Sequence, residues 1–140
     1  MTTTPDELRL RYLRERVLTA SPAQRVAMLY DRLALDLTRA ANTDAAGDPA
    51  SVPEVNAALD HAVAILAELL SSLDQSAGDV ADNLAGLYGY LLRELLAVRG
   101  GRRELLAPAT AIVETLRTAW AGAADAMAAG APTVAGRWVS

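Results

Sequence analysis

The fold is decided by the stretch Tyr12–Asp31, which reads YLRERVLTASPAQRVAMLYD. Ser21 can act as a helix N-cap, Pro22 stands at the first helical position, where a missing N–H costs nothing, and Gln24 stands three residues after the cap. This capping box predicts that a helix begins at Ser21. A helix start alone would not require any particular residues before the serine, so the stretch carries more information than a cap.

Apolar residues at steps of three and four extend this pattern through the chain and predict four long helices. Ser51 and Glu54 predict a second capping box after a linker rich in Gly, Asp and Pro. Gly100 and Gly101 are expected to close the third helix, and Pro108 to lie near the start of the fourth. The expected helices span about 21–42, 52–75, 79–99 and 108–128.

Four helices with short connections predict an all-α fold, an antiparallel four-helix bundle over residues 21–128. Residues 1–20 are expected to form a short N-terminal helical cap segment, and residues 129–140 a mobile C-terminal tail. The apolar stripe of the third helix is wider than one bundle seam requires. The extra apolar residues of this helix either belong to the core or form a surface that binds a partner. If a partner binds, we expect it to bind at this helix.

Composition narrows the classes of function. The 140 residues suit one domain that buries about two-thirds of its unfolded surface, and the absence of cysteine fits a reducing compartment, so we expect a cytoplasmic protein. No apolar stretch reaches the roughly 20 residues that span a bilayer, and the N-terminus is charged, so no membrane insertion is expected. The net charge of −4 argues against nucleic acid as a partner.

The sequence contains no recognisable motif of an enzyme active site or a metal site. A di-iron bundle needs two Glu-x-x-His motifs, whereas His61 is the single histidine of the chain. No glycine-rich phosphate loop is present. We therefore expect no enzyme, no cofactor and no metal. The residues leave open a regulatory or adaptor bundle that binds a partner helix and, less favoured, a small isomerase using Arg25, Arg32, Arg39 and Arg93.

Three groups of residues together resemble one known family. The first group is Tyr12, Val17, Thr19, Ala20, Ser21, Pro22, Met28, Leu29, Tyr30 and Asp31. The second is Ser72, Leu73, Asp74, Gly78, Ala81, Asn83, Leu84, Leu87, Tyr88, Tyr90, Arg93 and Leu95, and the third is Leu116, Arg117, Ala119 and Trp120. In this order and spacing they resemble the flagellar secretion chaperone family FliS. Leu13, Arg32, Ala77 and Gly89 depart from the family pattern, so the resemblance is to a divergent member.

The resemblance implies a function as well as a bundle. FliS proteins are flagellar export chaperones that bind the disordered C-terminal segment of flagellin in the cytoplasm, prevent its premature polymerisation and deliver it to the flagellar type III export apparatus. The partners implied here are therefore the flagellin segment and the export gate, with the chaperone as a monomer or weak dimer. The resemblance also implies that the segment around Tyr12 covers the binding groove while flagellin is absent.

The partner-binding residues expected on this basis come from the first two groups. Tyr30, Tyr88 and Tyr90 would otherwise be boundary residues with buried rings and solvated hydroxyls, and Asp31 could pair with Arg93 on the surface. The expected partner-binding residues are Tyr12, Val17, Ala20, Leu29, Tyr30, Asp31, Leu84, Leu87, Tyr88, Tyr90 and Leu91.

Overall fold

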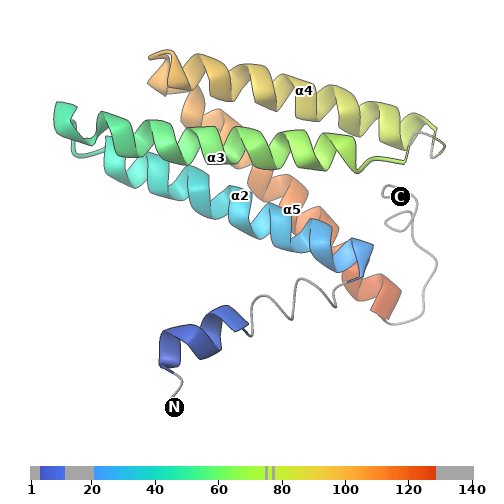
Figure 1. Ribbon diagram of the computed structural model, residues 1–140. Coiled ribbons are helices and arrows are strands. Elements are labelled where there is room, and N and C mark those ends of the chain that lie inside the picture. Colours follow the sequence, from blue (N-terminus) through green and yellow to red (C-terminus); the bar gives the residue numbers. More distant parts are fainter. Residues whose placement is uncertain (1–3, 12–20, 75, 77, 129–140) are drawn as a thin grey trace.

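The computed structural model describes residues 4–11, 21–74, 76 and 78–128, and within them it confirms the all-α four-helix bundle. Figure 1 shows α2, α3 and α4 side by side, with α5 crossing behind them. α2 packs on α3 and α5, and α3 packs on α4. The long helices are α2 (Pro22–Asp44), α3 (Val52–Ser71), α4 (Asp79–Arg99) and α5 (Leu106–Ala128), and two short 3₁₀ helices, η1 (Pro49–Ser51) and η3 (Arg103–Leu105), precede α3 and α5.

The capping box at the start of α2 is confirmed atom by atom. The Ser21 hydroxyl accepts a hydrogen bond from the backbone N–H of Gln24 at 3.1 Å, and the Gln24 side chain accepts one from the N–H of Ser21 at 2.9 Å. Two N–H groups that lack partners within the helix are thereby satisfied. α2 continues to Asp44, two residues beyond the expected end.

The second expected capping box is wrong. Ser51 makes no side-chain hydrogen bond to the start of α3, because it is already the last residue of η1. Its hydroxyl instead donates to the carbonyl oxygen of Asp48 at 2.6 Å. Asp48 is the residue that caps this turn, since its carboxylate accepts from the N–H of Ala50 at 2.9 Å. The sequence pattern therefore identified the right region and the wrong cap.

The expected ends of the other helices differ from the structure by a few residues. α3 stops at Ser71 rather than near 75, where the hydroxyls of Ser71 and Ser72 donate back to carbonyls three residues earlier and compete with a further helical turn. α4 has the expected bounds. α5 begins two residues before Pro108, which is tolerated because a first-turn N–H has no helical partner.

Before α2, the structure describes a short segment in which residues 5–11 are helical and every residue from Thr4 to Arg11 is exposed. Thr4 and Glu7 form a capping box, with both side-chain-to-backbone hydrogen bonds at 3.2 Å. The rest of the expected cap segment, including Tyr12, Val17 and Ala20, lies outside the described residues, and so does the expected tail over 129–140.

The core is built from the inward faces of the four long helices. Its centre consists of leucines that are fully buried, and the aromatic rings of α2, α4 and α5 close one part of it. Burying a leucine contributes roughly 1.5–3 kcal/mol relative to leaving it exposed, so these side chains supply much of the drive for folding. The fully buried leucines are Leu33, Leu37, Leu59, Leu66, Leu69, Leu91 and Leu95.

One charged side chain of the described residues, Asp36, is buried in this interior, with 2% of its surface exposed. Its carboxylate is hydrogen-bonded to Nδ1 of His61 on α3 and lies 3.5 Å from Nε of Arg32, one turn back on α2. A buried carboxylate is costly unless it is paired. His61 therefore acts as a polar contact that fixes α3 against α2.

We expect His61→Ala to lower the free energy of unfolding by about 1–3 kcal/mol, because it removes one of the two polar partners of a buried carboxylate. The neighbouring variant Asp60→Ala is a matched control, since it breaks the exposed ion pair with Arg99 that also joins two helices. Urea unfolding of both variants measures the difference. An equal loss of unfolding free energy in the two variants would show that the buried Asp36–His61 contact stabilises the protein no more than the exposed ion pair does.

Candidate functional site

Aromatic side chains from three helices meet in one cluster, which we call the aromatic cluster: Tyr30 of α2, Tyr88 of α4 and Trp120 of α5. At most 2% of each is exposed. The hydroxyls of the two tyrosines share a hydrogen bond. The rings of Tyr30 and Trp120 lie 6.1 Å apart between centroids and are tilted by 53°, a favourable aromatic geometry. The Trp120 indole N–H donates to the carbonyl oxygen of Ala23 at 3.0 Å.

Burial sets the protonation of this cluster. It raises the pKa of Tyr30 and of Tyr88, because a phenolate would lose its hydration in the apolar interior. Proximity and hydrogen bonding to Tyr88 raise the pKa of Tyr30 further. Both hydroxyls are therefore neutral near pH 7, and each satisfies the other.

An ion pair lies next to the aromatic cluster on the seam between α2 and α5. Nε of Arg117 is 2.8 Å from the Asp31 carboxylate, and a second nitrogen of Arg117 is 3.3 Å from Glu114. The expected pairing of Asp31 with Arg93 is therefore wrong, because Asp31 faces α5 rather than α4. A cavity of about 290 Å³ adjoins the ion pair, lined by Ala27, Tyr30, Asp31, Arg117, Thr118, Trp120 and Ala121.

The structure divides the expected partner-binding residues into three groups. Four of them are core residues whose side chains are at most 9% exposed: Tyr30, Leu84, Tyr88 and Leu91. Four remain at the surface, where Leu29 and Leu87 are partly exposed and Asp31 and Tyr90 are exposed. Tyr12, Val17 and Ala20 lie outside the described residues.

Two of these four surface residues, Leu87 and Tyr90, lie on α4. The exposed fraction of Tyr90 is 41%, and Leu87 is partly exposed. At 3.6 residues per turn, Leu87 and Val80 lie about 20° apart, and Leu87 lies about 120° around α4 from Arg99, which pairs with Asp60 of α3. α5 begins beside the end of α4 and then runs diagonally behind α3 and α2, so its second half lies away from α4 (Figure 1). This edge of α4 is consequently left partly uncovered.

α5 presents a matching edge. Arg117 ties one side of this helix to α2, and Leu116 and Ile112 lie about 100° and 140° around the helix from Arg117. We call the two edges together the α4–α5 face: Val80, Leu87, Ile112, Leu116 and Ala123, all partly exposed. Sequence reasoning missed the contribution of α5 to this face. Its spacing of three and four residues was visible, but only the packing shows which side of α5 is occupied by α2.

The partly exposed apolar side chains of the α4–α5 face are of the kind that bind a partner by apolar contact. Within the described residues there is no group of three or more His, Asp or Glu side chains that could hold a metal ion. Arg25, Arg32 and Arg39 are exposed along α2, Arg93 is exposed on α4, and none of the four lines the cavity beside the aromatic cluster. In the same part of the chain, no helix is both long and apolar enough to cross a bilayer.

Comparison with known families assigns the chain. A family model described as Flagellar protein FliS matches residues 6–127. The chain belongs to the FliS family. No curated protein matches it. FliS is a family of flagellar export chaperones rather than of enzymes. The three groups of residues that resemble FliS converge in space, because Tyr30, Tyr88 and Trp120 come one from each group and form the aromatic cluster.

We expect Tyr88→Phe to lower the free energy of unfolding by about 1–2 kcal/mol, because it leaves the buried Tyr30 hydroxyl without its partner. The double variant Tyr30→Phe/Tyr88→Phe should lose less than the sum of the two single variants, since it leaves no buried hydroxyl unpaired. Tyr90→Phe, on the exposed side of the same helix, is the control and should change little. Strict additivity in urea unfolding would contradict the hydrogen bond.

Alkaline pH should test the same pair. The raised pKa of both hydroxyls means that the folded protein keeps two protons that the unfolded chain releases near pH 10. The contribution to stability is complete below about pH 10 and is lost as the pH rises further. The chain contains no lysine and no cysteine, so tyrosines dominate titration in this range.

The measurement is urea unfolding at pH values from about 8 to about 11. We expect stability to fall at the alkaline end in the parent protein and to fall less steeply in Tyr30→Phe/Tyr88→Phe. The same slope in both proteins would show that these two hydroxyls do not carry the effect.

Proposed function

We propose that this FliS-family protein binds the disordered C-terminal segment of flagellin in the cytoplasm, prevents its premature polymerisation and delivers it to the flagellar type III export apparatus. The family assignment supports the class of function. The observation that carries the choice of site is the α4–α5 face, where apolar side chains of two helices stay partly exposed although the bundle is complete.

The chemistry of this face suits an amphipathic segment. Leu87, Leu116 and Ile112 are apolar side chains set on two rigid helices, and a segment that folds on contact can lay its own apolar side over them. Ordering a disordered segment costs chain entropy, and buried apolar area offsets this cost. Tyr90 lies about 60° around α4 from Leu87 and can add its ring at the border of the contact.

The aromatic cluster supports this face from below. It holds α2, α4 and α5 together through buried contacts, so the two edges of the face are presented on a fixed frame. In this proposal Tyr30, Tyr88, Leu84 and Leu91 position the surface residues instead of touching flagellin. Asp31, on the α2–α5 seam, and the partly exposed Leu29 are secondary candidates for contact.

Chaperone action then follows from occupancy. A flagellin segment held on the α4–α5 face is unavailable for filament assembly, and the population of free segment falls in proportion to the affinity and concentration of the chaperone. Release at the export gate completes the cycle. Two further points stay predictions. The first is that the segment around Tyr12 covers the face in the absence of flagellin, and the second is that the chaperone is a monomer or weak dimer.

We expect Leu87→Lys to weaken binding of a peptide with the C-terminal sequence of flagellin by roughly 10- to 100-fold, the equivalent of losing one buried leucine contact. The matched control is Leu96→Lys. This leucine is 54% exposed on the same helix, but nine residues from Leu87 and therefore about 180° around it. The control should change the dissociation constant less than about twofold.

Isothermal titration calorimetry measures both constants, and far-UV circular dichroism verifies that each variant is folded. A loss that is equal in the two variants would place the contact elsewhere. A loss in Leu96→Lys alone would move the site to the opposite edge of α4.

A further inference from the structure

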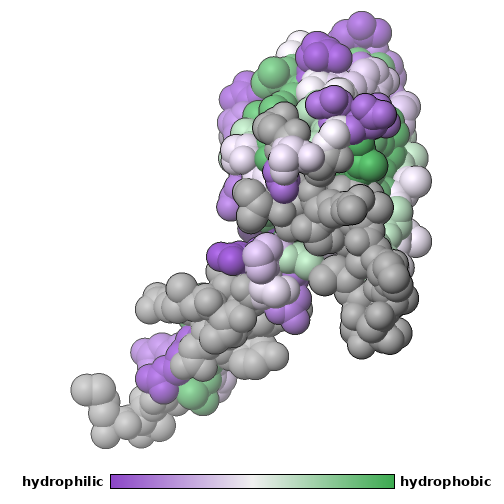
Figure 2. All heavy atoms as spheres, turned by 90° about the vertical axis from the view of Figure 1, so that its right-hand side faces the viewer, coloured by the Kyte–Doolittle hydropathy of each residue, from purple (hydrophilic) through white to green (hydrophobic). Residues whose placement is uncertain are grey.

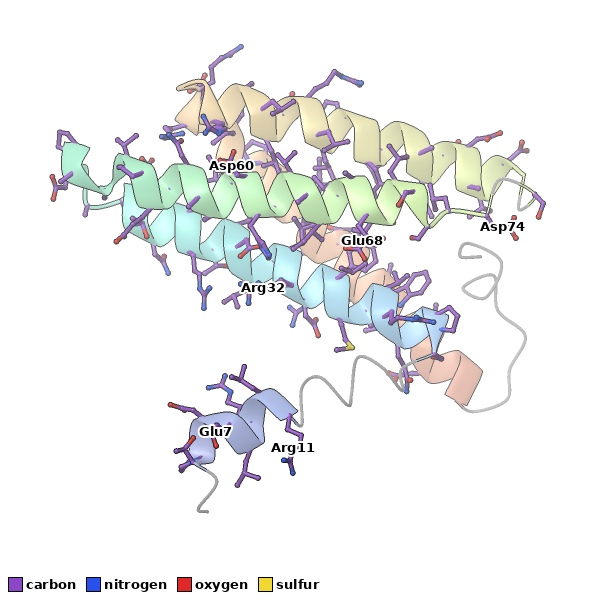
Figure 3. The ribbon with its side chains drawn as sticks, viewed as in Figure 1. Glu7, Arg11, Arg32, Asp60, Glu68 and Asp74 are labelled. Carbon is purple, nitrogen blue, oxygen red and sulfur yellow. The ribbon has the colours of Figure 1, made fainter. Side chains whose placement is uncertain are left out.

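Three arginines of α2 form a second exposed feature that flagellin binding leaves unused. Arg25, Arg32 and Arg39, which we call the arginine stripe, are all exposed. Their spacing of seven residues places them on one side of the helix at intervals of about 10.5 Å. Figure 3 labels the central member, Arg32, on the outer side of α2, and 48% of its side chain is exposed.

The charges of the arginine stripe are not balanced within the described part of the protein. The acidic residues of α2 are all engaged: Asp31 with Arg117 at 2.8 Å, Asp44 with Arg103 at 3.2 Å, and Asp36 with His61 and Arg32. Among the described residues, no carboxylate lies within ion-pair distance of Arg25 or Arg39. The guanidinium groups of Arg25 and Arg39 therefore have no ion-pair partner among the described residues. Arg32, between them, shares the Asp36 carboxylate with His61.

The surroundings of the stripe favour contact with another helix. Leu35, between Arg32 and Arg39 in the sequence, is 41% exposed. Across the seam, α3 exposes the small residues Ala57 and Ala64 on either side of His61. Small side chains allow a second helix to approach, and an exposed leucine gives it an apolar contact.

We propose that the arginine stripe binds an acidic amphipathic helix of a second protein, with carboxylates at seven-residue intervals opposite Arg25, Arg32 and Arg39. Arginine suits carboxylates because its planar guanidinium can donate two parallel hydrogen bonds to them. A nucleic acid fits less well, because the net charge of −4 repels a polyanion outside the immediate stripe. Discrete carboxylates on a helix meet the stripe without facing that repulsion along their whole length.

This surface is separate from the α4–α5 face. The Asp36–His61 contact places the stripe beside the α2–α3 seam, whereas α4 and α5 border the bundle on the opposite side. The acidic helix can therefore bind while flagellin is bound, and the proposal does not depend on the identity of the segment held by α4 and α5.

The test uses the full chain and two synthetic helical peptides, one with glutamate at every seventh position and an otherwise identical one with glutamine. We expect saturable binding of the glutamate peptide, weakened at least about tenfold in Arg25→Gln/Arg39→Gln and by salt raised to about 0.5 M. The control Arg93→Gln/Arg102→Gln makes the same change in net charge on exposed arginines outside α2 and should bind within about twofold of the parent.

Several results would overturn the proposal. Equal affinity for the glutamate and glutamine peptides would remove the role of carboxylates, and no saturation by the glutamate peptide would remove the site. An equal loss of affinity in the control variant would show that binding depends on the net charge of the protein and not on the arginine stripe. Tighter, stripe-dependent binding of a DNA oligonucleotide would assign the stripe to a polyanion. Repeating the titration with the flagellin peptide present separates this result from the test at Leu87, because the two surfaces are measured independently.

Discussion

The bundle depends on one contact across its interior, the hydrogen bond between the hydroxyls of Tyr30 and Tyr88. α2 and α4 occupy opposite corners of the bundle, and their long side chains meet where shorter ones would leave a gap. Two buried hydroxyls can be accommodated because each is the partner of the other, and Trp120 then covers the pair from α5. Three helices are thereby held at one point, and the fourth is fixed to α2 through the Asp36–His61 contact.

These interior contacts determine which surfaces remain for partners. Since α5 is drawn toward α2 by Trp120 and by the Asp31–Arg117 pair, it leaves the edge of α4 that carries Leu87 partly uncovered. The exposed apolar area is thus a consequence of how the core is closed. At the end of the bundle seen in Figure 2, hydrophobic residues lie in separate patches between hydrophilic ones.

Sequence reasoning recovered the fold because its signals are local. The capping box at Ser21, the periodic leucines and the glycines after Arg99 each act within a few residues and need no tertiary information. It misjudged the cap at Ser51, since an aspartate three residues earlier competes for the same turn. For the site, it expected Tyr30 and Tyr88 to bind a partner, and the structure buries both side chains. Whether a tyrosine of a bundle helix faces the core or a partner depends on the helix opposite, and in this protein another tyrosine stands there. The contribution of α5 to the site could not be predicted, because the sequence does not show which side of that helix α2 occupies.

The central claim is that a complete bundle presents an apolar face on which a disordered segment folds. Its most direct test is a calorimetric titration of the full chain with a peptide of the flagellin C-terminal segment, repeated at several temperatures and followed by far-UV circular dichroism. The account predicts one-to-one saturation, a negative heat-capacity change and a gain of helix on binding. A well-folded protein that shows no binding at tens of micromolar, or binding without any gain of helix, would contradict it.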